Sequence, residues 1–158
     1  MYFISCYLRR GIVYIPTMGK ISKGHYSGDE PVAVVPVSNT DGLRRALRET
    51  IARGNPPAPD LPRDQIPPPS IPKYASVKDW NTFARGTQTW DIDEREGVTK
   101  ISGYQKRSRG GWVPDPAQTV TMPPGSTVDD AINRMIAVLQ AQSRGANMKS
   151  AEQSHSEN

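Results

Sequence analysis

Cysteine and histidine are scarce in this chain of 158 residues. It has one cysteine, Cys6, and two histidines, His25 and His155. A single cysteine cannot form an internal disulfide bond, and it excludes a metal site built from cysteine ligands. This composition suits a reducing compartment, so we expect a cytoplasmic protein that carries no metal and no other cofactor.

Long apolar runs are also lacking. The opening segment MYFISCYL is apolar, but it is too short to cross a bilayer. It has neither the basic start nor the small-residue cleavage site of a secretory signal peptide. We therefore expect neither a membrane span nor secretion.

The motifs of common catalytic sites are absent. The sequence contains no Walker-type phosphate loop, no GxSxG turn and no HExxH motif, and Cys6 has no histidine near it in the sequence. His25 lies in the loop KGHYSGDE, shortly before Asp29 and Glu30. A catalytic histidine–carboxylate pair is one interpretation of that loop, but no second catalytic group can be named, so a solvated histidine is favoured. We predict that the protein is not an enzyme.

Positive charge is in modest excess. The formal net charge is +4 and the isoelectric point is near 9.3. Such a balance is compatible with nucleic acid, an acidic membrane face or an acidic protein partner. Several cations lie near the start of the chain, and no later run of Lys and Arg is interleaved with aromatic residues. Binding to nucleic acid is therefore not our main expectation.

Proline and glycine are frequent, with 15 and 13 residues, and the hydrophobic share is 35%. The segment 55–72, NPPAPDLPRDQIPPPSIP, is the most proline-rich. It cannot keep a helix or a central strand, so we interpret it as an extended surface strap, with an SH3-type ligand as the alternative. The expected organisation is an N-terminal extension or edge strand over 1–10, a single domain over 11–143 and a disordered tail over 144–158.

Apolar periodicity predicts two strands and a helix before the strap. Gly11–Thr17 and Pro31–Val37 predict strands, and Pro16 marks an edge or a bulge in the first. The helix that follows ends at Gly54. Its apolar stripe is Leu43, Ala46, Leu47 and Ile51, and its solvated face carries Arg44, Arg45 and Arg48.

The segment Lys73–Lys106 predicts a short helix followed by a β-hairpin. Ser76 and Asp79 resemble a capping box for the helix. Alternation of side-chain character with a period of two residues then predicts strands on either side of the turn Glu94–Gly97. We assign Trp80, Phe83 and Trp90 to the core.

A short strand over Thr119–Met122 and a helix capped by Ser126 complete the chain. The apolar stripe of this last helix is Val128, Ile132, Met135, Ile136 and Leu139. The element order is β-β-α, strap, α-β-β-β-α. It predicts an α+β fold in which helices pack on one side of an antiparallel sheet of about five strands.

Several separated motifs resemble those of one protein family. They are YIPT, GHYSGDEPV, ARGNP, KYASVKDWNTFARGTQTW and GGWVPDP, and the similar region spans Gly11–Gln142. These motifs resemble the immunity proteins of bacterial contact-dependent growth inhibition systems. The resemblance implies a small cytoplasmic protein that is not an enzyme. It implies a tight, specific interface with the C-terminal toxin domain delivered by a neighbouring cell, and a nuclease is the expected toxin.

The β-hairpin and the late tryptophan form the candidate surface for that partner. An acidic strand edge can mask a cationic groove, and tight inhibitors anchor aromatic side chains within a ring of charge pairs. A solvated hairpin end is the alternative for the acidic residues, and core burial is the alternative for Trp112. The candidate partner-binding residues are Asp93, Glu94, Glu96, Tyr104 and Trp112.

A second hypothesis is a module that binds single-stranded nucleic acid. The positive balance, the antiparallel sheet, and Tyr104 or Trp112 as stacking platforms are typical of such a module. This hypothesis predicts binding to oligonucleotides that weakens steeply with salt.

Overall fold

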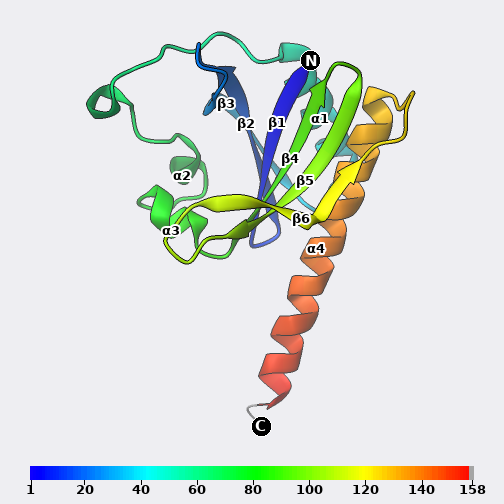
Figure 1. Cartoon of the computed structure of the whole chain (residues 1–158). Helices are drawn as coiled ribbons and strands as arrows, with labels where there is room; N and C mark the ends of the chain where they lie inside the picture. The colour runs from blue at the N-terminus through cyan, green and yellow to red at the C-terminus, as the bar shows by residue number, and fades with distance from the viewer. Residues whose placement is uncertain (157–158) are drawn as a thin grey trace.

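One antiparallel sheet organises the computed structural model, which describes residues 1–156, with side chains described up to residue 149. The spatial order of the strands in this part of the chain is β3-β2-β1-β4-β5-β6 (Figure 1). The predicted α+β class with an antiparallel sheet is confirmed, with six strands in place of about five in the described chain. The two long helices α1 and α4 share one face, but two short helices lie on the other, so the expectation that the helices pack on one side is only partly right. The bounds are β1 (Tyr2–Arg9), β2 (Ile12–Lys20), β3 (Tyr26–Pro36), α1 (Thr40–Arg53), β4 (Thr87–Arg95), β5 (Val98–Lys106), β6 (Trp112–Thr121) and α4 (Val128–Ser156).

Strand β1 lies in the middle of the sheet, between β2 and β4. The interpretation of residues 1–10 as an extension or an edge strand is therefore wrong. Arg10 and Gly11 form a two-residue turn rather than a break, and their φ angles of 50° and 76° suit a hairpin that follows the twist of the strands. Ile4 and Cys6 alternate into the core from this strand. Burial raises the pKa of the Cys6 thiol, which makes the thiol less reactive.

Strands β2 and β3 form a long hairpin with an irregularity at Pro16. Their pairing shifts register between Pro16 and Thr17, which confirms the predicted bulge. Strand β3 is the edge strand on this side and begins at Tyr26, well before the predicted start at Pro31. Pro31 and Pro36 have no amide hydrogen to donate, which suits a strand with a free edge.

Asn55 connects two strands where they separate. Strand β1 pairs with β2 near their shared turn, from Tyr7 to Arg9. Farther along, Asn55 Nδ2 donates to the carbonyl oxygens of Phe3 and Met18, each at 2.8 Å. Asn55 Oδ1 also accepts from the Phe3 amide at 2.9 Å. This side chain replaces direct strand pairing there and fixes the start of the strap to the sheet.

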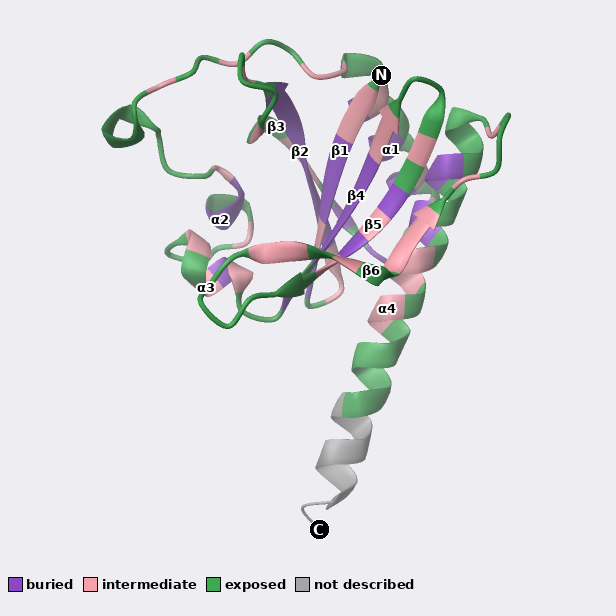
Figure 2. Ribbon diagram, in the orientation of Figure 1, coloured by how far each residue is buried: buried purple, intermediate pink, exposed green. Residues whose placement is uncertain are grey.

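The main core lies between the sheet and the two long helices, and its residues are among the buried positions in Figure 2. The assignment of Trp90 to the core is confirmed, since 6% of its surface is exposed. Both helix stripes are confirmed apart from Val128, which is exposed where α4 begins, and Ile51, which is only partly buried. The fully enclosed side chains include Leu43, Leu47, Ile132, Met135 and Leu139 from the helices, and Ile4, Val13, Ile15, Ile92 and Ile101 from the strands.

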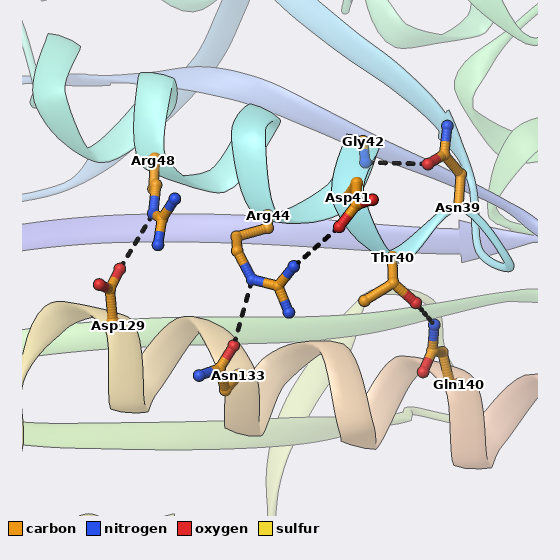
Figure 3. A network of polar contacts seen from close by, with 9 residues as sticks. All are labelled: Asn39, Thr40, Asp41, Gly42, Arg44, Arg48, Asp129, Asn133 and Gln140. Atoms are coloured by element: carbon orange, nitrogen blue, oxygen red, sulfur yellow. Dashed lines mark hydrogen bonds and ion pairs between the residues drawn. The ribbon is translucent and has the colours of Figure 1, made fainter.

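Polar contacts also link α1 to α4 (Figure 3). Arg48 Nε lies 3.0 Å from Asp129 Oδ1, and Arg44 Nε lies 3.5 Å from Asn133 Oδ1. Arg45, on the same helix, is exposed. The predicted solvated face of α1 therefore lies partly against α4. The sequence did not predict this contact, because helical periodicity alone does not reveal which helix will be its neighbour.

Helix α4 begins with a reciprocal cap and is longer than expected. Thr127 N donates to Asp130 Oδ2 at 2.8 Å, and Asp130 N donates to Thr127 Oγ1 at 3.1 Å, one residue later than the predicted cap at Ser126. The helix continues to Ser156, so the disorder predicted for 144–158 is wrong as far as the described residues extend. That segment contains Ala, Met, Lys, Glu and Gln, which are strong helix formers.

The strap and two short helices lie on the other face of the sheet. Ile71 and Phe83, from these helices, are buried against Tyr14 of β2. Phe83 therefore belongs to a second, smaller hydrophobic cluster rather than to the main core. The elements concerned are a 3₁₀ turn η1 (Arg63–Gln65), α2 (Ile71–Tyr74) and α3 (Trp80–Ala84).

The cap of α3 differs from the prediction. Asp79 Oδ1 accepts from Thr82 N at 2.8 Å, which makes Asp79 the N-cap. Ser76, the predicted cap, lies in the preceding turn with a positive φ of 55°. The pair Ser76 and Asp79 matched a capping box in spacing, but the helix begins three residues later, at Trp80.

The predicted hairpin between β4 and β5 is confirmed. Glu96 and Gly97 form its turn, with positive φ angles of 52° and 78°. Strand β6 begins at Trp112, earlier than the predicted start at Thr119. Its internal prolines are compatible with a strand because β6 is an edge of the sheet.

Candidate functional site

The acidic candidates lie together at the β4–β5 turn, but two of them have partners within the chain. Glu94 Oε2 lies 2.7 Å from the N-terminal amine, and Glu94 Oε1 accepts from Gly97 N at 2.9 Å. The hydrogen bond with the amine, together with that from Gly97, lowers the pKa of Glu94. Asp93 Oδ1 lies 3.0 Å from Arg95 Nε. Glu96 is exposed, so it is the acidic candidate most open to a partner.

Tyr104 belongs to a polar network on the sheet face that carries α3. Its side chain lies beside the carboxyl group of Asp91, and Ser5 Oγ donates to Asp91 Oδ1 at 2.6 Å. Tyr7 hydrogen-bonds to Ser5 and extends the network. Burial raises the pKa of Asp91 to about 6, and Asp93 nearby adds to the rise. Asp91 is thus a buried group rather than part of an acidic strand edge.

Trp112 packs against aromatic side chains of β1 and α3. Its ring centroid lies 5.8 Å from that of Trp80 at an interplanar angle of 82°, and 6.3 Å from that of Tyr7. Both tryptophans are half-buried, so neither is a fully enclosed core residue. Trp112 is therefore partly in a hydrophobic cluster and partly at the surface, which lies between the two alternatives. The assignment of Trp80 to the core is only partly right.

A groove opens beside this tryptophan pair, where α3 meets the turn between β5 and β6. It has a volume of about 200 Å³. Its basic lining residues are Arg85, which follows α3, and Lys106 and Arg107, which end β5 and begin the turn. We call it the tryptophan groove, and its lining is Trp80, Asn81, Ala84, Arg85, Lys106, Arg107, Gly110, Gly111 and Trp112.

The sequence carried a signal for this groove, the run KRSRGGW at 106–112. In it three cations precede a tryptophan without being interleaved with aromatic residues, so the run did not match the pattern sought for nucleic-acid binding. Arg85, in contrast, is far from this run in sequence. Only the packing of α3 against the start of β6 brings Arg85 and Trp80 to the same place.

A larger pocket of about 600 Å³ lies between the strap and the sheet. Tyr7, Met18 and Tyr26 form part of its floor, and Trp80 forms part of its wall. Glu30 and Lys73, which form an ion pair, lie at its edge. The opposite charges of this pair compensate one another, and Asp29 adds a further carboxylate to a lining that is otherwise rich in proline and other apolar residues.

The remaining chemical candidates are not assembled into a site. His25 is exposed in the loop between β2 and β3. Of its two neighbouring carboxylates, Glu30 pairs with Lys73, and Asp29 Oδ1 accepts from the Glu30 amide at 2.7 Å. Within the described residues, no three side chains of His, Cys, Asp or Glu come together as a metal ion would require.

No family model matches the chain, and no curated protein matches its sequence. Among solved structures, the chain is similar to a protein of unknown function from Neisseria meningitidis. The TM-score is 0.63, the sequence identity is 16%, and the match covers 89% of this chain and 94% of that chain. A likeness at this identity shows the fold alone. Among the described helices, none has the length and apolar character needed to cross a bilayer.

Proposed function

We propose that the protein is an immunity protein of a contact-dependent growth inhibition system. In this proposal it binds the C-terminal toxin domain of its cognate system in the cytoplasm and neutralises it through a tight protein–protein interface. It transforms no substrate itself. The motifs between residues 11 and 142 suggest the family, and the tryptophan groove supplies the physical support.

The observation that carries the proposal is the contact between Trp80 and Trp112 at the surface. Tryptophan and arginine are the residues most enriched among those that dominate the energy of protein interfaces. Here two tryptophans pack edge to face at 5.8 Å, and Arg85 and Arg107 line the same groove. Because each ring is held by the other, little side-chain entropy remains to be lost when a partner binds.

Binding of single-stranded nucleic acid is the second candidate, since the same groove combines aromatic rings with cations. Its geometry favours a protein partner. Stacking platforms must offer open ring faces to successive bases, whereas Trp80 and Trp112 lie at 82° and cover part of one another. Tyr104, the other expected platform, is held in the network around Asp91.

Growth of bacteria that express the toxin domain encoded beside this chain tests the proposal. We expect growth to stop with the toxin domain alone and to recover when the chain is expressed with it. A Trp80→Ala and Trp112→Ala double variant should restore growth less well, at equal levels of folded protein. Failure of the wild-type chain to protect would contradict the proposed function.

A further inference from the structure

We propose that the tryptophan groove receives an acidic segment of the protein partner, which also places one apolar side chain against Trp80 and Trp112. This inference rests on the proposed function and names the chemistry of the partner at the groove. The binding surface then lies at the end of the sheet opposite the acidic β4–β5 turn. The acidic turn drew attention in the sequence, but the basic end is the one left without charge partners.

The first step in the argument is the uncompensated charge of the groove. Its lining includes Arg85, Lys106 and Arg107 and contains no acidic side chain. Arg85 and Arg107 are exposed, and neither makes an ion pair among the described residues. Lys106 Nζ donates to the carbonyl oxygen of Ala84 at the end of α3, which is not a carboxylate. Three like charges in one groove repel one another, and a partner's carboxylates would relieve that repulsion.

The second step is that the nearest acidic group of α3 is already engaged. Asp79 caps the helix, and hydrogen bonds from Thr82 are the main cause that lowers its pKa. The charges of Lys78 and Arg85 lower that pKa further, so Asp79 already lies in a positive field. One carboxylate among these cations leaves the end of the sheet positive. In this inference the complementary charge comes from the partner.

The third step is the size and character of the groove. A volume of about 200 Å³ is smaller than the roughly 300–1,000 Å³ of pockets that enclose a small molecule. It suits a single side chain of a protein. Trp80 and Trp112 give that side chain an apolar wall, and Gly110 and Gly111 leave the rim free of side chains. Charge around an apolar anchor is the usual anatomy of an interface centre.

A strand of nucleic acid fits these observations less well. Its phosphates repeat along a line, so proteins that bind it carry cations along a groove that follows several nucleotides. Here the cations gather at one end of the sheet, around one small groove. Tyr7 and Tyr14 on the adjoining sheet face pack against Phe83 of α3, at 6.0 Å and 5.4 Å between ring centroids, and are not free to stack bases.

Charge reversal at the groove tests the inference. The variant is Arg85→Glu with Arg107→Glu, and the matched control is Arg45→Glu with Arg134→Glu. The control pair is equally exposed, carries the same change of charge and lies on α1 and α4. The measurement is the association rate and the Kd for the purified toxin domain encoded beside this chain, at low and at high salt.

We expect the groove variant to associate about tenfold or more slowly at low salt, and the difference to shrink at high salt, because steering by charge is screened. The control should stay within about twofold of the wild type, since its charges do not face the partner. If the groove variant does not fold, Arg85→Gln with Arg107→Gln removes the charges without reversing them and should give a smaller loss in the same direction.

Three results would overturn the inference, and they differ in what they leave standing. If the wild type binds the toxin domain and the groove variant binds equally fast and tightly, the acidic segment is excluded while the proposed function survives. If the wild type does not bind the toxin domain at all, both fall. Salt-sensitive binding of the wild type to single-stranded oligodeoxythymidine, lost in the groove variant, would assign the groove to nucleic acid instead.

Discussion

Ser5 and Asp91 face one another across strands β1 and β4, and the Ser5 hydroxyl donates to the Asp91 carboxylate at 2.6 Å. Asp91 is 5% exposed and Ser5 is 4% exposed, so this contact lies beneath the surface of the sheet. Thr89 Oγ1, on the same face, is buried without a hydrogen-bond partner among the described residues. The sheet face beside α3 therefore has a polar interior, which makes its stability sensitive to pH.

Asp91→Asn should change how stability depends on pH. Burial raises the pKa of Asp91 from 3.8 to about 6, so the folded chain holds this proton over a range in which the unfolded chain has released it. The contribution of Asp91 to stability therefore falls as pH rises from about 4 to about 6, and the pKa rise corresponds to about 3 kcal/mol at neutral pH.

The measurement is urea unfolding of both chains from about pH 4 to about pH 7. Asparagine does not titrate, so the stability of the variant relative to the wild type should improve by about 3 kcal/mol over this range. Other carboxylates titrate in both chains and cancel in the comparison. A constant difference between the two chains would show that Asp91 has an ordinary pKa.

Asn55→Ala should destabilise the fold by about 2–3 kcal/mol, because it removes three hydrogen bonds and leaves the Phe3 amide and two carbonyl groups without partners. Pro57→Ala, in the same strap, is the comparison, since Pro57 is exposed. Chemical unfolding measures both. Equal, small losses would mean that Asn55 does not hold β1, β2 and the strap together.

Gly103→Ala should destabilise the chain by about 1–3 kcal/mol through overpacking. A Cβ atom at this position would lie 2.7 Å from the Trp90 ring and 2.9 Å from Gln118 Cβ. Gly145→Ala is the control, because nothing lies within 4 Å of its Cβ position and the residue itself is exposed on helix α4. There the change should stabilise by up to about 1 kcal/mol. If Gly103→Ala left the melting temperature in thermal unfolding unchanged, the space around the Trp90 ring would have to be larger than these distances indicate.

Trp112→Ala should weaken binding to the toxin domain by about 2 kcal/mol or more, which is about 30-fold in Kd. Tyr26→Ala is the matched control, because Tyr26 is also a half-buried aromatic residue that stacks on a neighbour, Phe3, at 4.4 Å. It lies on β3, the opposite edge of the sheet. Calorimetric titration of each folded variant gives the Kd, and equal losses in the two would remove Trp112 from the interface.

Periodicity was sufficient to predict both long helices and the β4–β5 hairpin, because each presents a regular apolar face. It was misleading at the N-terminus. There Arg10-Gly11 resembled a break between two segments. A tight turn in which both residues have positive φ needs only two residues, and this one joins the neighbouring strands β1 and β2. In the segment that begins at residue 144, disorder was predicted but the helix continues to Ser156. The end of an apolar stripe does not end a helix when the residues that follow include strong helix formers.

The proposed binding surface was harder to predict than the fold, because it combines residues distant in sequence. Trp112 was singled out in the sequence and lines the tryptophan groove, but Trp80 and Arg85 reach the same groove only through the packing of α3. Two of the acidic candidates, Asp93 and Glu94, have partners within the chain. Glu94 is held by the N-terminal amine, a partner that becomes available only because β1 pairs with β4. Such contacts depend on strand order, which a single sequence does not reveal.

The most direct test of the central claim is to titrate the purified chain into an activity assay of the toxin domain that the proposed function places in the neighbouring reading frame. We predict complete loss of toxin activity at one chain per toxin domain, and a dissociation constant in the nanomolar range or below, as dedicated inhibitors require. Full toxin activity in the presence of excess folded chain would contradict the account.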